Sequence, residues 1–168
     1  MRIAVAAALA AALAAPQAGA QVVNESSISA DAALEVAAAA LAQSRKDGEK
    51  VSVTVIDAAG RPKAMVRDDG AAPHTAEHSF RKAYTALSHK MPSAEYGKRA
   101  KDSGGAIGPQ LLPNITTAAG GVPIRTAGAV VGAVGVSGTP GAHGGGEHDA
   151  HCAEAGLMRI AKDTPAAR

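Results

Sequence analysis

The sequence predicts an α+β domain: a two-layer sandwich in which helices pack on a mainly antiparallel, five-stranded sheet. Segments with the two-residue alternation of strands come in neighbouring groups joined by short turns, as in antiparallel hairpins. Segments with helical periodicity stand at both ends of the chain and as a pair in the middle, so strands and helices do not alternate regularly. The predicted order is one helix, two strands, two helices, three strands and one helix.

The first predicted units are a helix over residues 29–43 and a hairpin over residues 51–68. Apolar residues recur at helical spacing in the first unit, Ser29 or Asp31 can cap its start, and Gly48 ends it. The strand period then appears in three alternating valines, Val51, Val53 and Val55.

Two helices are predicted in the middle of the chain. The first begins near Thr75, carries an apolar face, and is broken at Met91-Pro92. The second begins at Ser93, which can cap it, and runs to about Lys101.

The remaining predicted elements are three short strands and a last helix. The strands start at Ile115, at Val122 and at Ala129, and the third runs to Val136. Gly132 and Gly135 in the third strand leave room for another group to approach the backbone closely. A Gly/Pro-rich loop over 138–146 then leads to a helix over 147–162.

Residues 1–20 have the layout of a secretory signal peptide. Arg2 precedes an apolar, alanine-rich run over 3–15, and Ala18-x-Ala20 fits the small-residue rule for cleavage. The run is too short for a stable membrane anchor, and the alternative is a structural helix. We expect a periplasmic or secreted mature protein, with one domain over residues 21–168.

Composition narrows the possible partners. The formal charge is +2, and it falls to +1 without Arg2, while Phe80, Tyr84 and Tyr96 are the only aromatic residues, so nucleic-acid binding is not predicted. The mature chain has no second long apolar run, so no membrane span is predicted in it. Cys152 is the single cysteine and cannot form an internal disulfide. The abundance of small residues favours close packing and a tight interface in a homo-oligomer.

Several motifs occur in a fixed order, at residues 53–60 with 67–71, 73–75 with 81–86, 92–95, 120–124 with 128–138, and 149–157. Together they resemble the haem-binding GlcG/HbpS-like family, which includes haem-degrading-domain-like and PduO C-terminal-like proteins. The resemblance covers about residues 30–162. It implies a mainly antiparallel sheet similar to profilin or PAS domains, frequent oligomerisation, and haem binding in the secreted members.

The first candidate site is a histidine pair. His74 and His78 are four residues apart and can share one helix face, where they could hold a haem iron or another transition metal. Gly120 and Gly121 belong to Gly-rich strands that could border an apolar slot, although tight turns and bulges explain them better. The alternative for the histidines is that His74 caps the loop and His78 is solvated.

Nearby polar residues could complete that site. Arg67, Arg81 and Lys82 could bind carboxylates such as haem propionates by charge-assisted hydrogen bonds. Tyr84 could ligate or hydrogen-bond a ligand, and the alternative is packing in the core. The alternative for the three cations is pairing with nearby acids, Asp68, Asp69 or Glu77.

A second candidate site contains His143, His148, His151 and Cys152. At 100° per residue the last three project together, away from the predicted core stripe of the final helix. This arrangement suits a surface site for a divalent transition metal, or a site completed by a neighbouring subunit. The alternative is an exposed polar face with a half-buried thiol.

These observations favour an exported haem-binding protein for storage, sensing or sequestration. No arrangement of Ser, His, Asp or Cys predicts a catalytic triad. Two other functions stay open: a periplasmic enzyme acting on a small organic molecule, and a metal-binding oligomer that uses the His/Cys face. The physiological ligand is not identified by the sequence.

Overall fold

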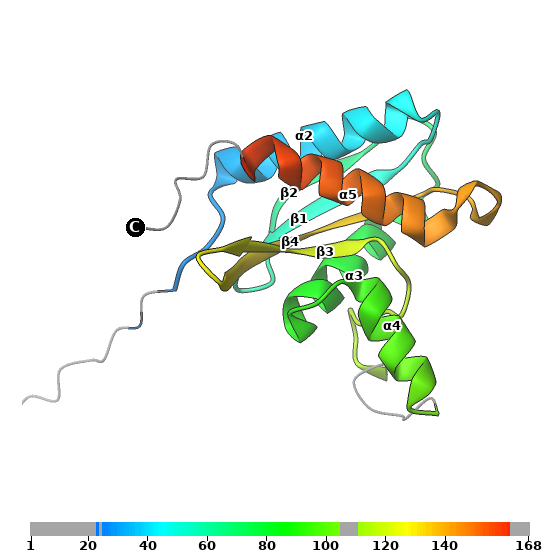
Figure 1. The fold of residues 1–168 in the computed structure, drawn as a ribbon. Helices are drawn as coiled ribbons and strands as arrows, with labels where there is room; N and C mark the ends of the chain where they lie inside the picture. The colour runs from blue at the N-terminus through cyan, green and yellow to red at the C-terminus, as the bar shows by residue number, and fades with distance from the viewer. Residues whose placement is uncertain (1–22, 24, 105–110, 162–168) are drawn as a thin grey trace, which may run out of the picture.

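The computed structural model describes residue 23, residues 25–104 and residues 111–161. The predicted signal peptide, residues 1–20, lies outside these residues. The fold is α+β, as predicted (Figure 1). Its main elements are α2 (Ala30–Lys46), β1 (Ser52–Asp57), β2 (Pro62–Arg67), α3 (His74–His89), α4 (Ser93–Asp102), β3 (Gly121–Thr126), β4 (Ala129–Ser137), the short 3-10 helix η3 (Gly141–His143) and α5 (Gly145–Ala161).

The sheet has four strands among the described residues, in the order β2-β1-β4-β3, and every neighbouring pair is antiparallel. The predicted fifth strand, from Ile115, is therefore wrong. Backbone N–H groups that would bond to a neighbouring strand donate instead to helix side chains. Thr116 N–H donates to Thr85 Oγ1 at 2.9 Å, and Gly121 N–H donates to Ser93 Oγ at 2.8 Å. The Ser93 hydroxyl consequently does not cap α4.

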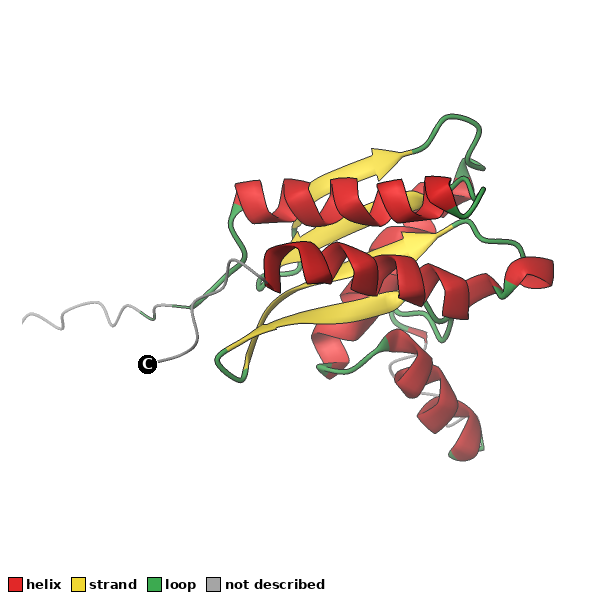
Figure 2. Ribbon diagram, turned by 45° about the horizontal axis from the view of Figure 1, so that its top comes forward, coloured by secondary structure: helices red, strands yellow, loops and turns green. Residues whose placement is uncertain are grey.

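Helices cover both faces of this sheet, so the predicted two layers become three. In Figure 1, α2 and α5 lie on one side of the strands and α3 and α4 on the other. Figure 2 shows α2 and α5 running side by side in front of the sheet. The two helices are antiparallel, so the end of α2 lies beside the start of α5.

The face under α2 and α5 holds the larger core. Val53 and Val55 of β1 are fully buried there with Val36 of α2 and Ala153 of α5. Gly156 lets the two helices touch, because a Cβ atom at this position would lie 2.7 Å from the Val36 carbonyl oxygen. The close packing of α2 against α5 therefore depends on small side chains rather than on large ones.

The face under α3 is more polar. Thr54 of β1 and Ser79 of α3 share a buried hydroxyl–hydroxyl hydrogen bond of 2.7 Å, and Ser52 and Thr75 share another of 2.7 Å. The helix backbone lies directly on the strand at Gly135, where a Cβ atom would stand 2.0 Å from the Ser79 carbonyl oxygen. The close approach predicted from the glycines of this strand is confirmed.

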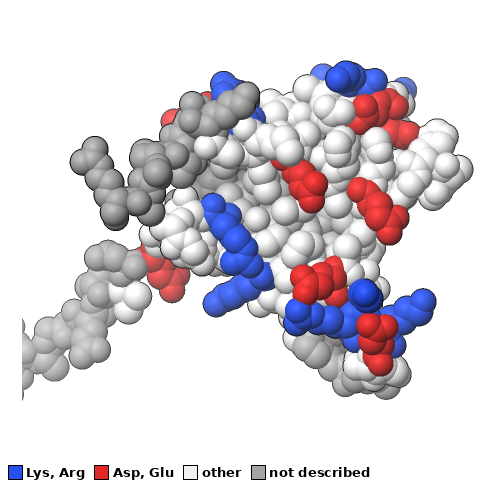
Figure 3. Space-filling view, in the orientation of Figure 1, with Lys and Arg blue, Asp and Glu red and all other residues white. Residues whose placement is uncertain are grey.

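Charged side chains are interspersed by sign on the visible surface (Figure 3). Helix α4 carries both signs and an exposed ion pair between Arg99 and Glu95. Among the described residues, no helix has the length and hydropathy to cross a membrane.

Replacing Gly135 by alanine should destabilise the fold. The new methyl group has no space between β4 and α3, and overpacking of this kind lowers the free energy of unfolding by about 1–3 kcal/mol or more. Gly141→Ala is the matched control, because nothing lies within 4 Å of its Cβ position, and its effect should stay within about 0.5 kcal/mol. Urea unfolding of both variants measures the difference, and equal stabilities would contradict the contact.

Candidate functional site

One face of α3 lines the cleft that gathers most of the predicted cofactor residues. His74, His78 and Lys82 follow each other at four-residue intervals, so they stack along the helix. The cleft has a volume of about 580 Å³. Its other walls come from three segments: Ala72 and Thr75 at the start of α3, Ala118 and Ala119 before β3, and Ser137, Gly138, Thr139, Pro140, Gly146, Glu147 and Asp149 from the end of β4 to α5.

His78 is held in the cleft wall by two hydroxyl groups. Its Nδ1 lies 3.1 Å from Ser137 Oγ, and its Nε2 lies 3.4 Å from Thr116 Oγ1. Burial lowers the pKa of His78, and the nearby Lys82 ammonium lowers it further. A neutral imidazole with both nitrogens engaged is a positioned wall residue rather than an open metal ligand.

Lys82 forms an ion pair with Asp149 of α5 at the inner end of the cleft. The distance from Nζ to Oδ2 is 2.6 Å, and the side chains are only 2% and 3% exposed. Burial lowers the pKa of Lys82, while the Asp149 carboxylate opposes that shift. The other carboxylate oxygen, Oδ1, accepts the Thr139 backbone N–H at 3.1 Å. The pair therefore joins α3 to α5 and to the loop after β4.

Thr139 adds an unsatisfied polar group to the same wall. Its Oγ1 is buried and has no hydrogen-bond partner within the described chain. Buried hydroxyl groups almost always find a partner, which can be a water or a ligand. This hydroxyl, the ion pair and His78 give the inner part of the cleft a polar character.

His74 stands exposed at the rim. It makes no hydrogen bond with any described residue, which leaves its imidazole available. A second hollow of about 320 Å³ shares His74 and His78 and is completed by Glu77 and Arg81. Arg81 pairs with Glu77 at 2.5 Å, as the acid-pairing alternative predicts, and its side chain is 43% exposed.

Other predicted cofactor residues lie elsewhere. Arg67 is exposed at the end of β2 and does not line the cleft. Tyr84 packs half-buried against Phe80, with ring centroids 5.7 Å apart, as the packing alternative predicts. Gly120 and Gly121 are buried against Lys82: Cβ atoms there would lie 2.9 Å from its Cδ and 2.0 Å from its carbonyl oxygen. The two glycines therefore allow α3, the helix that carries the candidate site, to pack closely against this segment.

The residues that sequence reasoning missed are Asp149, Thr139 and Ser137. No signal in the sequence pointed to Asp149, because Lys82 stands opposite the apolar face predicted for its helix and therefore looks solvent-exposed. Nothing in the sequence spacing pairs positions 82 and 149, because the sheet brings them together.

The predicted metal cluster is rearranged. Cys152 is fully buried, so the expectation that it faces away from the core is wrong. The buried residues of α5 are Asp149, Cys152, Ala153 and Gly156. The stripe predicted for this helix was Ala150, Ala153, Leu157 and Ile160, of which Ala153 is buried and Leu157 and Ile160 pack half-buried against the core. His151 is exposed. His143 pairs with Glu49 instead, with Nδ1 and Oε1 2.6 Å apart. Of the predicted histidines, His148 lies next to Cys152.

The fold and the cleft define an α+β domain with a candidate ligand site, and comparisons with known proteins specify its class. The sequence profile of the family described as "Haem degrading protein HbpS-like" matches residues 28–158. Protein GlcG of Escherichia coli strain K12 is 33% identical over 110 residues, which are 66% of this chain and 81% of GlcG. The chain belongs to the HbpS-like family.

Solved structures agree with this assignment. A double mutant of Streptomyces reticuli HbpS superposes with a TM-score of 0.74 at 35% identity, covering 86% of this chain and 96% of HbpS. The PduOC:heme complex superposes with a TM-score of 0.71 at 23% identity, covering 80% of this chain and 95% of PduOC. The second likeness shows the fold alone.

Removing the Lys82 ammonium should destabilise the protein strongly. Lys82→Met leaves the Asp149 carboxylate buried without its partner, and breaking a buried pair in this way costs about 3–5 kcal/mol. Adding Asp149→Asn should recover part of the loss, because the amide oxygen can still accept the Thr139 N–H. Lys98→Met, at an exposed position of α4, is the control. Equal unfolding curves for Lys82→Met and the control would refute the role of the pair.

Proposed function

We propose that this chain is an exported haem-binding protein that stores, senses or sequesters haem, and that His74 is its iron ligand. The observation that carries the proposal is the available imidazole at the rim of a cleft bordered mainly by small side chains. Haem-related function is a property of the family to which the chain belongs.

The residues around His74 suit a haem group. Ala72, Ala118 and Ala119 leave the outer cleft open for a flat ring, since their side chains end at Cβ. Arg81 lies beside His74 in the adjoining hollow and is partly exposed, so its guanidinium can meet a propionate. When bound, haem would supply redox-active iron, while these residues would orient the ring and satisfy its carboxylates.

Titration with haemin tests the site. The protein should shift the Soret band, and His74→Ala should weaken binding by about tenfold or more, because it removes the nitrogen that would ligate the iron. His151→Ala is the matched control, since His151 is also exposed but does not line the cleft. Absence of a Soret shift at stoichiometric haemin would reject the proposed function, and an unchanged affinity in His74→Ala would reject the ligand.

The polar inner part of the cleft favours a second candidate, a small polar organic molecule. The buried Lys82–Asp149 pair and the unsatisfied Thr139 hydroxyl offer hydrogen bonds that a haem ring does not use. A periplasmic enzyme acting on such a molecule would need this polar wall. Native mass spectrometry of protein from its own host separates the candidates, because the ligand mass identifies haem or a smaller compound.

Export is part of the proposal and rests on the layout of residues 1–20. The protein recovered from the periplasm or medium of its host should have an intact mass that begins at Gln21. A full-length chain in the cytoplasmic fraction would contradict export.

Self-association is also proposed. A small apolar hollow between α2 and the edge strand β2 is bordered by Leu34, Met65 and Val66, whose exposed fractions are 58%, 55% and 37%. An exposed apolar patch beside an open sheet edge is typical of a subunit contact.

A further inference from the structure

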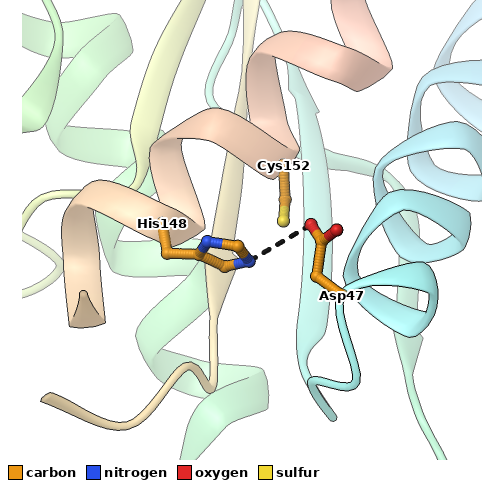
Figure 4. A group of neighbouring side chains, drawn as sticks. All are labelled: Asp47, His148 and Cys152. Atoms are coloured by element: carbon orange, nitrogen blue, oxygen red, sulfur yellow. Dashed lines mark ion pairs between the residues drawn. The ribbon is translucent and has the colours of Figure 1, made fainter. Parts of the chain in front are cut away.

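Three side chains with metal-binding atoms meet where α2 ends and α5 begins. Asp47 is the residue that follows α2, and His148 and Cys152 stand one turn apart on α5. A carboxylate oxygen, an imidazole nitrogen and the thiol sulfur all lie within 4.8 Å of one another. Figure 4 shows the histidine and the cysteine pointing toward the aspartate from the neighbouring helix.

The geometry is close to that of a metal site. His148 Nε2 lies 3.3 Å from Asp47 Oδ2, and two ligand atoms bound to one tetrahedral zinc are also roughly 3.3 Å apart. The sulfur lies within 4.8 Å of both other ligand atoms, and a bound ion would hold it roughly 3.6 Å from them, so it has to move by at most about 1 Å. One side-chain rotation of this size does not require the helices to move.

His148 Nε2 forms an ion pair with Asp47 but, among the described residues, makes no hydrogen bond. It is buried from solvent and has no hydrogen bond of acceptable geometry with any residue that the structure describes. A buried nitrogen that points at a carboxylate and a thiol without a hydrogen bond is an available ligand atom. This observation is independent of the clustering of the three residues.

The Asp47 carboxylate is already held in position by a hydrogen-bond donor outside the cluster. The Gln43 side-chain amide donates to both carboxylate oxygens, at 3.0 and 2.9 Å. Outer hydrogen bonds of this kind fix the direction of a ligating carboxylate. The side chains of His148 and Asp47 are 25% and 24% exposed, so an ion has a path from solvent.

We propose that Asp47, His148 and Cys152 bind one divalent transition metal ion of the zinc class. Thiolate, imidazole and carboxylate together are donors that zinc accepts, and three protein ligands leave the fourth position for a water. Binding releases the thiol proton to solvent as the sulfur–metal bond forms. This site lies outside the proposed haem cleft and does not depend on it.

The ligand set differs from the set that the sequence suggests. His143 is engaged by Glu49. The His151 ring is exposed, and its centroid lies 6.0 Å from that of His148. Asp47 replaces both histidines, and it lies directly after α2, 101 positions before His148 in the chain.

Cobalt(II) is the probe, because it accepts zinc ligands and reports thiolate coordination by a sulfur-to-metal charge-transfer absorption. Haem-free protein should develop this band to saturation at one cobalt ion per chain, and zinc should abolish it. Cys152→Ala should lose the band. Asp47→Asn and His148→Gln should each weaken cobalt binding at least about tenfold, because even outer partners of a metal site have effects of that size.

His151→Ala is the matched control and should bind cobalt like the unmodified protein. His74→Ala should do the same, which separates this result from the haem titration. No band in the unmodified protein would overturn the proposal, as would a loss in His151→Ala with no loss in Asp47→Asn. Thermal unfolding of each metal-free variant checks the fold, and the two variants at partly exposed positions keep the test valid if Cys152→Ala does not fold.

Discussion

The ion pair between Lys82 and Asp149 is the contact on which the two helical layers and the cleft depend. It joins α3 on one face of the sheet to α5 on the other, and both partners are almost completely buried. The buried Asp149 carboxylate is tolerated only because the Lys82 ammonium and the Thr139 N–H both bind it. The ion pair also sets the inner end of the cleft, because Lys82 forms the wall that follows His74 and His78 along α3.

The pair is possible because glycines bring the backbones together. Gly121 and Gly135 let α3 lie directly on the sheet, so the Lys82 side chain starts close to the strand ends. Gly120 provides the remaining space, with φ +119 and no Cβ atom to strike the lysine stem. The Gly-rich strands therefore act on the cleft indirectly: they set the depth at which the helix that carries His74 packs on the sheet.

Local patterns in the sequence predicted the α+β class, the hairpin over residues 51–68, and the helix that begins near Thr75. They did not predict which side of the sheet each helix covers, because hydroxyl pairs such as Thr54–Ser79 make the α3 face look solvent-exposed. They also gave a strand from Ile115, since nothing local shows that Thr85 takes the N–H of Thr116. The histidine pair was found by spacing, whereas Asp149 and Asp47 depend on contacts between distant segments.

The first turns of α5 then explain how one helix contributes both to the cleft and to the cluster around His148. Consecutive residues on a helix point about 100° apart, so Asp149 turns toward Lys82 while His148 turns toward the end of α2. Cys152 follows His148 by one turn and faces the same way, into the contact with α2. A bound metal ion would hold α5 to α2, whereas the ion pair holds α5 to α3. The start of α5 therefore contributes a cleft wall on one side and two of the proposed metal ligands on the other, without any side chain shared between them.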